Sequence, residues 1–195
     1  EVFAGVDLAI DKGSRVVVLG YNGAGKTTLL KLLAGVERTD GEGGVVSGHG
    51  LKVGYFAQEH DTLDMDASVW ENIRHAAPDA GEQDLRGLLG AFMFSGPQLE
   101  QPTGTLSGGE RTRLALAGLV SSAANVLLLD EPTNNLDPIS REQVLDALRT
   151  YEGAVVLVTH DPGAVEALEP ERVIILPDGT EDLWSQEYME IVELA

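Results

Sequence analysis

The chain has 195 residues, of which 43% are hydrophobic, and its 13 basic and 32 acidic residues give a formal net charge of −19. This length suits one domain, and the acidic balance excludes a broad basic surface for nucleic acid. The chain has no cysteine, which excludes disulfides and thiolate metal sites. No apolar run approaches the ~18 residues that span a bilayer, so we expect a globular α/β protein in the cytoplasm.

The N-terminal residues alternate loosely between apolar and polar side chains. Residues 2–10 end at the turn Asp11-Lys12-Gly13, and residues 15–19 form a β-branched apolar run. Together they predict a hairpin whose second strand is buried. Because the chain begins without Met and already inside a strand-like pattern, we expect it to be a piece of a longer protein.

A glycine-rich stretch, Gly20-Tyr21-Asn22-Gly23-Ala24-Gly25-Lys26-Thr27, separates this strand from residues 28–34, which are apolar at helical spacing. Its glycines allow a sharp turn that aims successive backbone N–H groups at one point, and the following helix start adds its positive end. In such a loop Lys26 reaches the β- and γ-phosphates of a nucleotide, and the Thr27 hydroxyl ligates Mg²⁺. A chance glycine-rich turn is the weaker alternative, since the strand before it and the helix after it are both in place.

A loop and a strand come next. Residues 41–50 predict a glycine-rich loop that contains a short strand at Val45-Val46. Residues 52–57 predict a further strand, which delivers Gln58 at its end.

From residue 64 to residue 102 the apolar pattern is helical. Ser68 and Glu71 have the spacing of a capping box, and residues 82–89 continue with apolar side chains at helical intervals. The apolar cluster at residues 91–94 favours the core of a small helical subdomain over a partner surface.

A second glycine-bearing helix start follows at Leu106-Ser107-Gly108-Gly109-Glu110, and the helix runs to about residue 120. Ser107 is a good N-cap, and the two glycines beside it expose backbone N–H groups, as at an anion site. An ordinary capped helix start has the same spacing, so both interpretations stay open on these residues alone.

Two acidic residues follow the apolar strand predicted at residues 126–129. In a parallel α/β sheet, ligands lie beyond the C-terminal ends of the strands, where Asp130 and Glu131 stand. Adjacent strand residues point to opposite faces, so one carboxylate can hold Mg²⁺ while the other polarises an attacking water. Asp-Glu-Pro is also ordinary turn chemistry, but with the phosphate-binding loop in the same chain we favour the site.

The C-terminal third predicts a helix that starts at Asp137-Pro138 and a buried strand at residues 154–158. A lone histidine is more often structural, but His160 ends a strand of the same sheet and can therefore reach a γ-phosphate. The remaining predictions are a hairpin at 172–176 and 181–184 and a closing helix at 186–194, which docks on the core through Tyr188, Ile191 and Val192.

Together these stretches resemble the nucleotide-binding domain of the ATP-binding-cassette (ABC) superfamily, and they occur in the superfamily's order. The matches are Walker A at 20–27, the Q-loop at Gln58, the signature at 106–110, Walker B with the following Glu at 126–133, the D-loop at 134–137 and the switch histidine at His160. The resemblance implies an α/β P-loop NTPase of ABC type. Such a fold has a mainly parallel core sheet flanked by helices, an antiparallel β portion and a small helical subdomain. It further implies one domain over residues 1–195, with 64–105 as the helical subdomain.

Within the superfamily the chain looks most like the second ATPase domain of a soluble ABC-F protein. Asn134 stands where transporter ATPases more often have Ser or Ala, and residues 54–58 and 176–184 are also ABC-F-like. Asn135 departs from the family, in which many relatives have His. The resemblance places the aromatic side chain that stacks on adenine upstream of residue 1.

The resemblance also implies a role for each matched residue. Glu131 is the general base toward water and His160 contacts the γ-phosphate, with Lys26 and Gln58 as further catalytic residues. Mg²⁺ is ligated by Thr27 and Gln58 and supported by Asp130. ATP is held by Gly20, Asn22, Gly23, Ala24, Gly25, Lys26, Thr27 and Thr28, and from the other side by Ser107, Gly108, Gly109 and Asp137.

In the family, the signature helix of one domain covers the ATP held by the Walker A motif of another, so the resemblance implies a second ABC domain as partner. For an ABC-F protein it also implies the ribosome, in translation or in protection from antibiotics, through regions outside this chain. No direct membrane contact is expected. Two alternatives stay open: the motor subunit of an ABC membrane transporter, and a nucleotide-gated scaffold without meaningful turnover.

Overall fold

A computed structural model describes residues 6–38, 44–46, 48–57 and 62–194, so the predicted site residue Gln58 lies outside the described residues. Within them, six strands form one sheet in the order β2-β3-β4-β1-β5-β6. Neighbouring strands are parallel except for the antiparallel pair β5 and β6. The strands are β1 (Arg15–Leu19), β2 (Val53–Phe56), β3 (Val126–Asp130), β4 (Ala154–Val158), β5 (Arg172–Ile175) and β6 (Thr180–Leu183).

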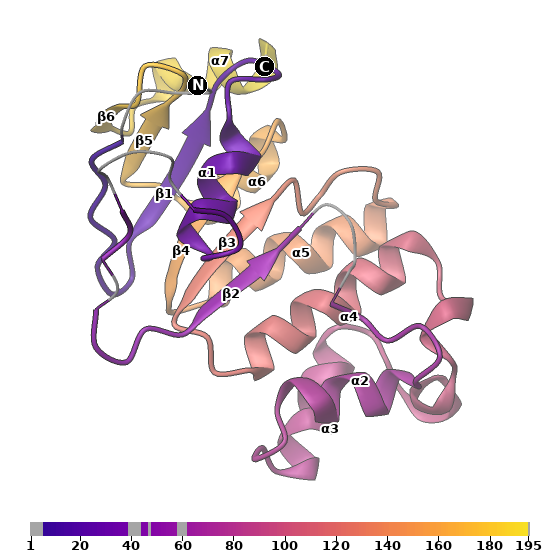
Figure 1. Ribbon diagram of the computed structural model, residues 1–195. Coiled ribbons are helices and arrows are strands. Elements are labelled where there is room, and N and C mark those ends of the chain that lie inside the picture. Colours follow the sequence, from indigo (N-terminus) through magenta and orange to yellow (C-terminus); the bar gives the residue numbers. More distant parts are fainter. Residues whose placement is uncertain (1–5, 39–43, 47, 58–61, 195) are drawn as a thin grey trace.

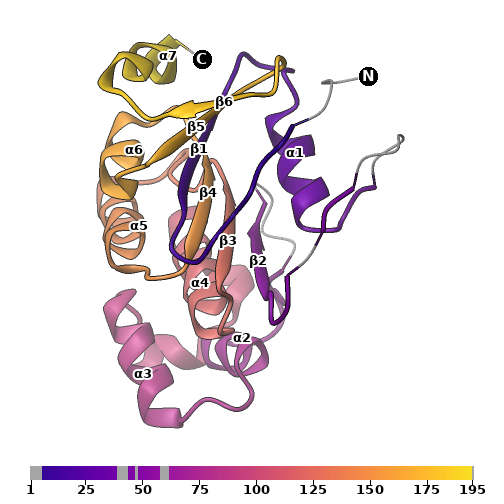
Figure 2. The ribbon, with the colours of Figure 1, turned by 90° about the vertical axis from the view of Figure 1, so that its left-hand side faces the viewer.

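Helices cover both faces of this sheet (Figures 1 and 2). Helix α1 (Lys26–Leu33) lies on one face, and α4 (Gly108–Ser121), α5 (Pro138–Thr150) and α6 (Pro162–Leu168) lie on the other. The predicted closing helix is a 3₁₀ turn, Gln186–Tyr188, followed by α7 (Met189–Leu194), and it docks on the core as expected. No helix in the described part of the chain is long and apolar enough to cross a membrane.

The central strands explain why both faces are covered. Leu127 and Leu129 of β3 pack with α4, α5 and α6, whereas Leu128 packs with Leu30 of α1. All five residues of β3 and of β4 are buried, as is typical of parallel strands between two helical layers. The C-terminal ends of β1, β3 and β4 meet at one edge of this sheet, and the predicted site residues follow directly after them.

A helical part, residues 64–105, lies to one side of the sheet (Figure 1). It contains α2 (Val69–Ala76), α3 (Glu82–Ala91) and two 3₁₀ turns, Gly96–Glu100 and Thr103–Thr105. The predicted capping box is present, because the Glu71 N–H donates to Ser68 Oγ over 3.1 Å and the Ser68 N–H donates to Glu71 Oε2 over 2.7 Å. The sequence thus predicted correctly where α2 begins.

The apolar cluster at residues 91–94 is divided between the core and the surface. Phe92 and Phe94 are buried, but Met93 is 49% exposed. The reason is local: α3 ends at Ala91, and Met93 takes a left-handed conformation with φ of +64°, which turns its side chain away from the core.

Two sequence predictions about strands are wrong. Residues 6–10 are not in a strand, and β1 has no free edge for a hairpin partner, since β4 and β5 pair with it in parallel on its two sides. The short strand expected at Val45-Val46 is also absent, and Val46 is 95% exposed. Among the named strands of the described residues, the antiparallel pair lies instead near the other end of the chain, between β5 and β6.

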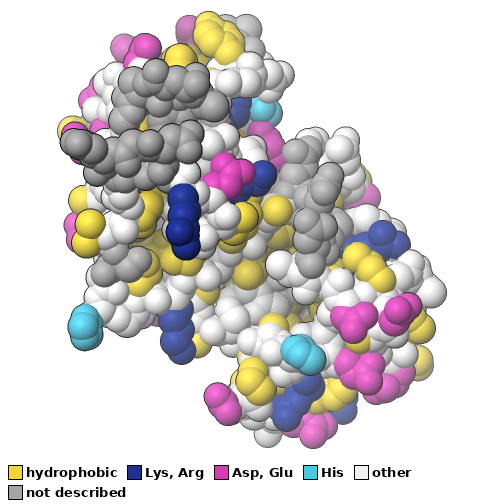
Figure 3. Space-filling view, in the orientation of Figure 1, with side chains coloured by type: hydrophobic (Ala, Val, Ile, Leu, Met, Phe, Trp, Pro, Cys, Tyr) yellow, Lys and Arg dark blue, Asp and Glu magenta, His cyan; other side chains and the backbone are white. Residues whose placement is uncertain are grey.

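Charge is distributed unevenly on the face drawn in Figure 3. Acidic side chains gather over the helical part, and Lys and Arg side chains lie singly or in small groups. This face therefore has no broad basic patch, in agreement with the net charge of −19.

Candidate active site

The glycine-rich stretch forms a tight loop between β1 and α1. Gly20 has φ of +153°, and a Cβ on it would lie 2.7 Å from the carbonyl oxygen of Leu176. Gly25, with φ of +100°, is the N-cap of α1. Gly23 has φ of +85° and no atom within 4 Å of the position of a Cβ, so the space beside it is open. The loop thus combines an enforced turn with free space beside its backbone, as a phosphate-binding loop requires.

Lys26 closes this loop from within. Its Nζ donates to the carbonyl oxygens of Gly20 and Tyr21. Burial lowers the pKa of Lys26, while the nearby charges of Glu131 and Asp130 raise it. A cation that contacts the loop carbonyls and lies near two carboxyl groups stands where the charge of a phosphate would be neutralised.

Thr27 and Asp130 bring two hard oxygen ligands together. Thr27 Oγ1, at the start of α1, donates to Asp130 Oδ2, at the end of β3, over 2.7 Å. Burial raises the pKa of Asp130, and the Thr27 hydrogen bond and the Lys26 charge oppose this shift. Hydroxyl and carboxylate oxygens suit Mg²⁺, which takes one or two protein ligands and fills its other positions with phosphate and water. The two residues therefore fit such an ion, although the described part of the chain contains no group of three or more His, Cys, Asp or Glu side chains that could hold a metal ion by themselves.

Glu131, directly after the end of β3, contacts His160. Its Oε1 lies 2.9 Å from His160 Nε2, and its Oε2 accepts a hydrogen bond from the His160 backbone N–H over 3.3 Å. Burial raises the pKa of Glu131 to about 7; the His160 backbone hydrogen bond opposes the shift and the Asp130 charge adds to it. Burial, with help from the Lys26 charge, lowers the pKa of His160. Burial thus disfavours the charged form of both groups, and a carboxyl group whose pKa lies near the working pH suits proton transfer.

The backbone holds Glu131 in an unusual conformation. Its φ is +50°, in the left-handed region that non-glycine residues rarely adopt, and its N–H donates to the Val158 carbonyl oxygen over 2.9 Å. Such a conformation costs on the order of 1 kcal/mol and persists only where surrounding contacts enforce it. The strain lies at the residue that carries the perturbed carboxyl group.

The second glycine-bearing helix start, at Ser107, packs against other elements than the first. Ser107 is the N-cap of α4 and forms a capping box with Glu110. Helix α4 packs on α2, α3, α5 and β2, whereas α1 packs on β3 and β4. The two predicted glycine-bearing helix starts, one at the glycine-rich loop and one at Ser107, therefore pack against different elements.

Asp137 forms the junction between α4 and α5. It caps α5 by accepting hydrogen bonds from the N–H groups of Ile139 and Ser140, and the Ser140 hydrogen bonds lower its pKa.

The other predicted nucleotide residues lie around the glycine-rich loop. Asn22 is exposed on the phosphate-binding loop, Ala24 is buried beneath it, and Thr28 lies in the first turn of α1. The structure thus gathers the predicted nucleotide residues into two groups: 20–28, and 107–109 with Asp137.

Sequence reasoning missed a cluster behind His160. Asp161 caps α6 and accepts two hydrogen bonds from the Arg141 guanidinium, over 2.8 and 2.7 Å. It also accepts a hydrogen bond from the Thr133 side chain. This carboxylate ties the segment after Glu131 to the segment after β4. The cap was visible in the sequence as Asp-Pro, but nothing in the spacing pointed to Arg141.

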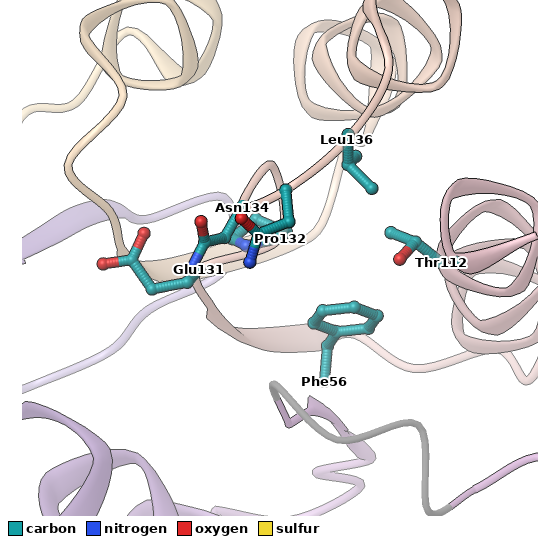
Figure 4. A pocket seen from close by; sticks show the side chains of 8 residues that line it. Phe56, Thr112, Glu131, Pro132, Asn134 and Leu136 are labelled. Atoms are coloured by element: carbon teal, nitrogen blue, oxygen red, sulfur yellow. The ribbon is translucent and has the colours of Figure 1, made fainter.

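A pocket of about 170 Å³ opens beside Glu131 (Figure 4). Figure 4 shows that the Glu131 carboxyl group points away from Phe56, Thr112 and Leu136, which line the opposite end of the pocket. The complete lining is Phe56, Gly108, Thr112, Glu131, Pro132, Asn134, Asn135 and Leu136.

The two glycines of the second helix start have different surroundings, which predicts opposite effects of substitution. A Cβ on Gly109 would lie 2.5 Å from both Asp137 Oδ2 and Ser140 Oγ, whereas a Cβ on Gly108 would meet nothing within 4 Å. We expect Gly109→Ala to lower the free energy of unfolding by about 1–3 kcal/mol, and Gly108→Ala to leave it unchanged or higher. Thermal unfolding of both variants checks this, at about 2–4 °C per kcal/mol for a domain of this size. Equal melting temperatures would contradict it.

Fold and site together define a class of protein: this is an ATPase domain of the ATP-binding-cassette type. The family model described as "ABC transporter" matches residues 3–134, and the chain belongs to that family. "Probable ATP-binding protein YheS" of Haemophilus influenzae is 46% identical over 162 residues, 83% of this chain and 25% of the relative. "ABC transporter F family member 5" of Arabidopsis thaliana is 37% identical over 194 residues, 98% of this chain and 28% of the relative. The chain thus spans about a quarter of the length of these curated relatives, and the expected resemblance to ABC-F proteins is confirmed.

Solved structures confirm the predicted fold class. A dimeric post-hydrolysis state of the ATP-binding cassette MJ0796 bound to ADP and Pi superposes with a TM-score of 0.73 at 23% identity, covering 93% of this chain and 90% of that one. A second dimeric structure of MJ0796, described as a bacterial ABC transporter cassette, gives a TM-score of 0.76 at 22% identity with the same coverage. At this identity the likeness concerns the fold.

Proposed function

We propose that the chain is the ATP-binding and ATP-hydrolysing domain of an ABC-F-type protein, corresponding to its second cassette. The observation that best supports hydrolysis is the contact between the Glu131 carboxyl group and His160 beside the phosphate-binding loop. Burial also raises the pKa of this carboxyl group to about 7. A general base works best when its pKa lies near the working pH. The relatives named as F family members support the ABC-F assignment. Residues 1–195 form one cassette in this proposal, with 64–105 as its helical subdomain.

In the proposed reaction the chain's residues place and neutralise the substrate and do little covalent chemistry. The loop amides and the Lys26 ammonium hold the phosphates of ATP. Glu131 accepts the proton of the attacking water, and His160 holds the γ-phosphate side of the site. Thr27 and Asp130, with Gln58 from outside the described residues, would hold Mg²⁺, which when bound supplies further charge neutralisation.

A complete site is proposed to need two domains. Ser107, Gly108 and Gly109 lie at the start of a helix with different packing partners from α1, and the structurally similar cassette MJ0796 is dimeric. We therefore propose head-to-tail pairing with a second ABC domain, so that Ser107 of one domain covers the ATP on Lys26 of the other. ABC-F membership further suggests action on the ribosome in the cytoplasm, in translation or antibiotic protection. Because acidic side chains gather on the drawn face, we place the ribosome contacts outside this chain.

Mixing two inactive variants tests the pairing. Lys26→Ala removes the phosphate contact and Ser107→Arg blocks the signature start, so each variant alone is expected to lose turnover. In an equal mixture half of the pairs are mixed, and each mixed pair contains one site that is intact on both sides. Phosphate release should therefore recover to about a quarter of the wild-type rate.

Circular dichroism of both variants serves as the control for folding. No recovery from two folded variants would overturn the head-to-tail pairing. High turnover per domain by wild-type protein at concentrations where it is a verified monomer would do the same.

A further inference from the structure

Arg113, in the middle of α4, is a buried cation with an unexpected set of partners. Its side chain is only 8% exposed, and NH1 donates to the carbonyl oxygen of Phe92 over 2.9 Å. The guanidinium carbon lies 5.1 Å from the centroid of the Phe94 ring. Burying a charge is costly unless hydrogen bonds and opposite charges compensate it. The residue therefore ties α4 to the turn at 92–94 in the helical part.

The same guanidinium faces Glu110, the acidic residue of the capping box at the start of α4. Arg113 NH2 lies 4.0 Å from Glu110 Oε1, and this oxygen also accepts a hydrogen bond from Gln98 Nε2 over 3.0 Å. The other oxygen, Oε2, accepts from the Ser107 N–H over 2.8 Å. The Glu110 carboxylate thus connects the backbone of Ser107 to the side chains of Gln98 and Arg113. Gln98 belongs to the helical part itself, and Arg113 contacts it through the carbonyl oxygen of Phe92.

The start of α4 is consequently held from two sides. Gly109 lies against Asp137 and Ser140 with no room for a Cβ, while Glu110 is held by Gln98 and Arg113. The close contacts at Gly109 restrict movement of the helix start toward α5. The Ser107 N–H donates to the Glu110 carboxylate, which Gln98 and Arg113 contact in turn, so its orientation depends on where these two side chains place that carboxylate.

We propose that Arg113 is a positioning residue: through Glu110 it orients the helix start at Ser107 and links it to the 92–98 segment of the helical part. This inference rests on the proposed function, because Ser107 acts on the nucleotide of a paired domain. Arg113 itself lies too deep to touch ATP. A movement of residues 92–98 reaches the signature start along this path.

The mixed-pair assay tests this inference, because it separates positioning from general destabilisation. In the mixture of Lys26→Ala and Ser107→Arg chains, the intact site takes its signature from the Lys26→Ala chain alone. Arg113→Met in that chain should lower the recovered turnover about tenfold or more, the loss expected when hydrogen bonds to a charged group are removed. The same substitution in the Ser107→Arg chain should change it less than twofold, because that signature is already blocked.

Two further variants allow the proposal to be tested even if Arg113→Met folds poorly. Arg113→Lys retains the charge but replaces the planar fork, whose NH1 reaches Phe92 and whose NH2 faces Glu110, with a single nitrogen, so we expect an intermediate loss. Gln98→Ala removes the other contact of Glu110, and it should show the same dependence on which chain carries it. Because both act through one carboxylate, the double variant should lose less than the two single losses combined.

Arg86→Met is the matched control, since Arg86 is an exposed arginine of the helical part that pairs with Glu82 over 2.9 Å. It should leave the recovered turnover unchanged from either chain. An equal loss from both chains with Arg113→Met, or no loss from either, would overturn the positioning role. If the mixture of Lys26→Ala and Ser107→Arg chains without a change at Arg113 recovers no turnover, the proposed pairing is wrong, and the positioning role of Arg113, which depends on it, is wrong as well.

Discussion

Glu131→Gln should keep nucleotide binding and slow ATP cleavage by about 10²–10⁴-fold, the usual worth of a general base. The amide has the size of the carboxyl group and costs no more in the left-handed backbone conformation at this position. It cannot accept a proton from water, however, so only the chemical step is affected. Phosphate release under saturating ATP measures the loss, and a nucleotide titration measures the retained affinity.

Glu152→Gln is the matched control, because Glu152 is exposed and directly precedes Gly153 at the opposite end of β4 from His160. Its turnover should equal that of the wild type. If Glu131→Gln turned over ATP at the wild-type rate, Glu131 would lose the role of general base, and the contact with His160 would have to serve another purpose.

Lys26→Ala should weaken binding of ATP itself by about 10–100-fold, because a charged hydrogen bond is worth roughly 1.5–3 kcal/mol. The side chain is the cation of the loop and already points its Nζ at the loop carbonyls of Gly20 and Tyr21. Calorimetric titration with a non-hydrolysable ATP analogue gives the dissociation constant without interference from turnover.

Lys12→Ala removes the same charge from an exposed turn before β1, at the opposite end of that strand from the loop. Its affinity for the analogue should match that of the wild type, which excludes a general effect of net charge. An unchanged affinity in Lys26→Ala would remove this lysine from the phosphate site.

The local elements of this fold were predictable because their signals lie within a few residues. Ser68 with Glu71 marked the start of α2, Asp137-Pro138 marked the start of α5, and the apolar runs before Gly20 and Asp130 marked strands that the structure contains. Each of these depends on capping or on local burial. The same locality explains why the sequence could point to the two halves of the candidate site, since each half is a short continuous motif.

Pairing and packing between distant segments were not predictable. The hairpin expected at the N-terminus was wrong because the neighbours of β1 are β4 and β5, more than a hundred residues away in the chain. The buried position of Arg113 and the fork of Arg141 on Asp161 likewise depend on helices that meet only in the folded state. A charged residue at helical spacing carries no sign of the carbonyl oxygen or carboxylate it will meet.

The left-handed backbone conformation at Glu131 creates a conflict between thermal stability and catalysis, because the residue proposed as the general base is not the residue that this conformation favours. Glycine adopts φ of +50° freely, so a screen that rewards survival at high temperature alone would favour Glu131→Gly and discard the base. Directed evolution of this domain for robustness therefore needs a simultaneous selection for phosphate release.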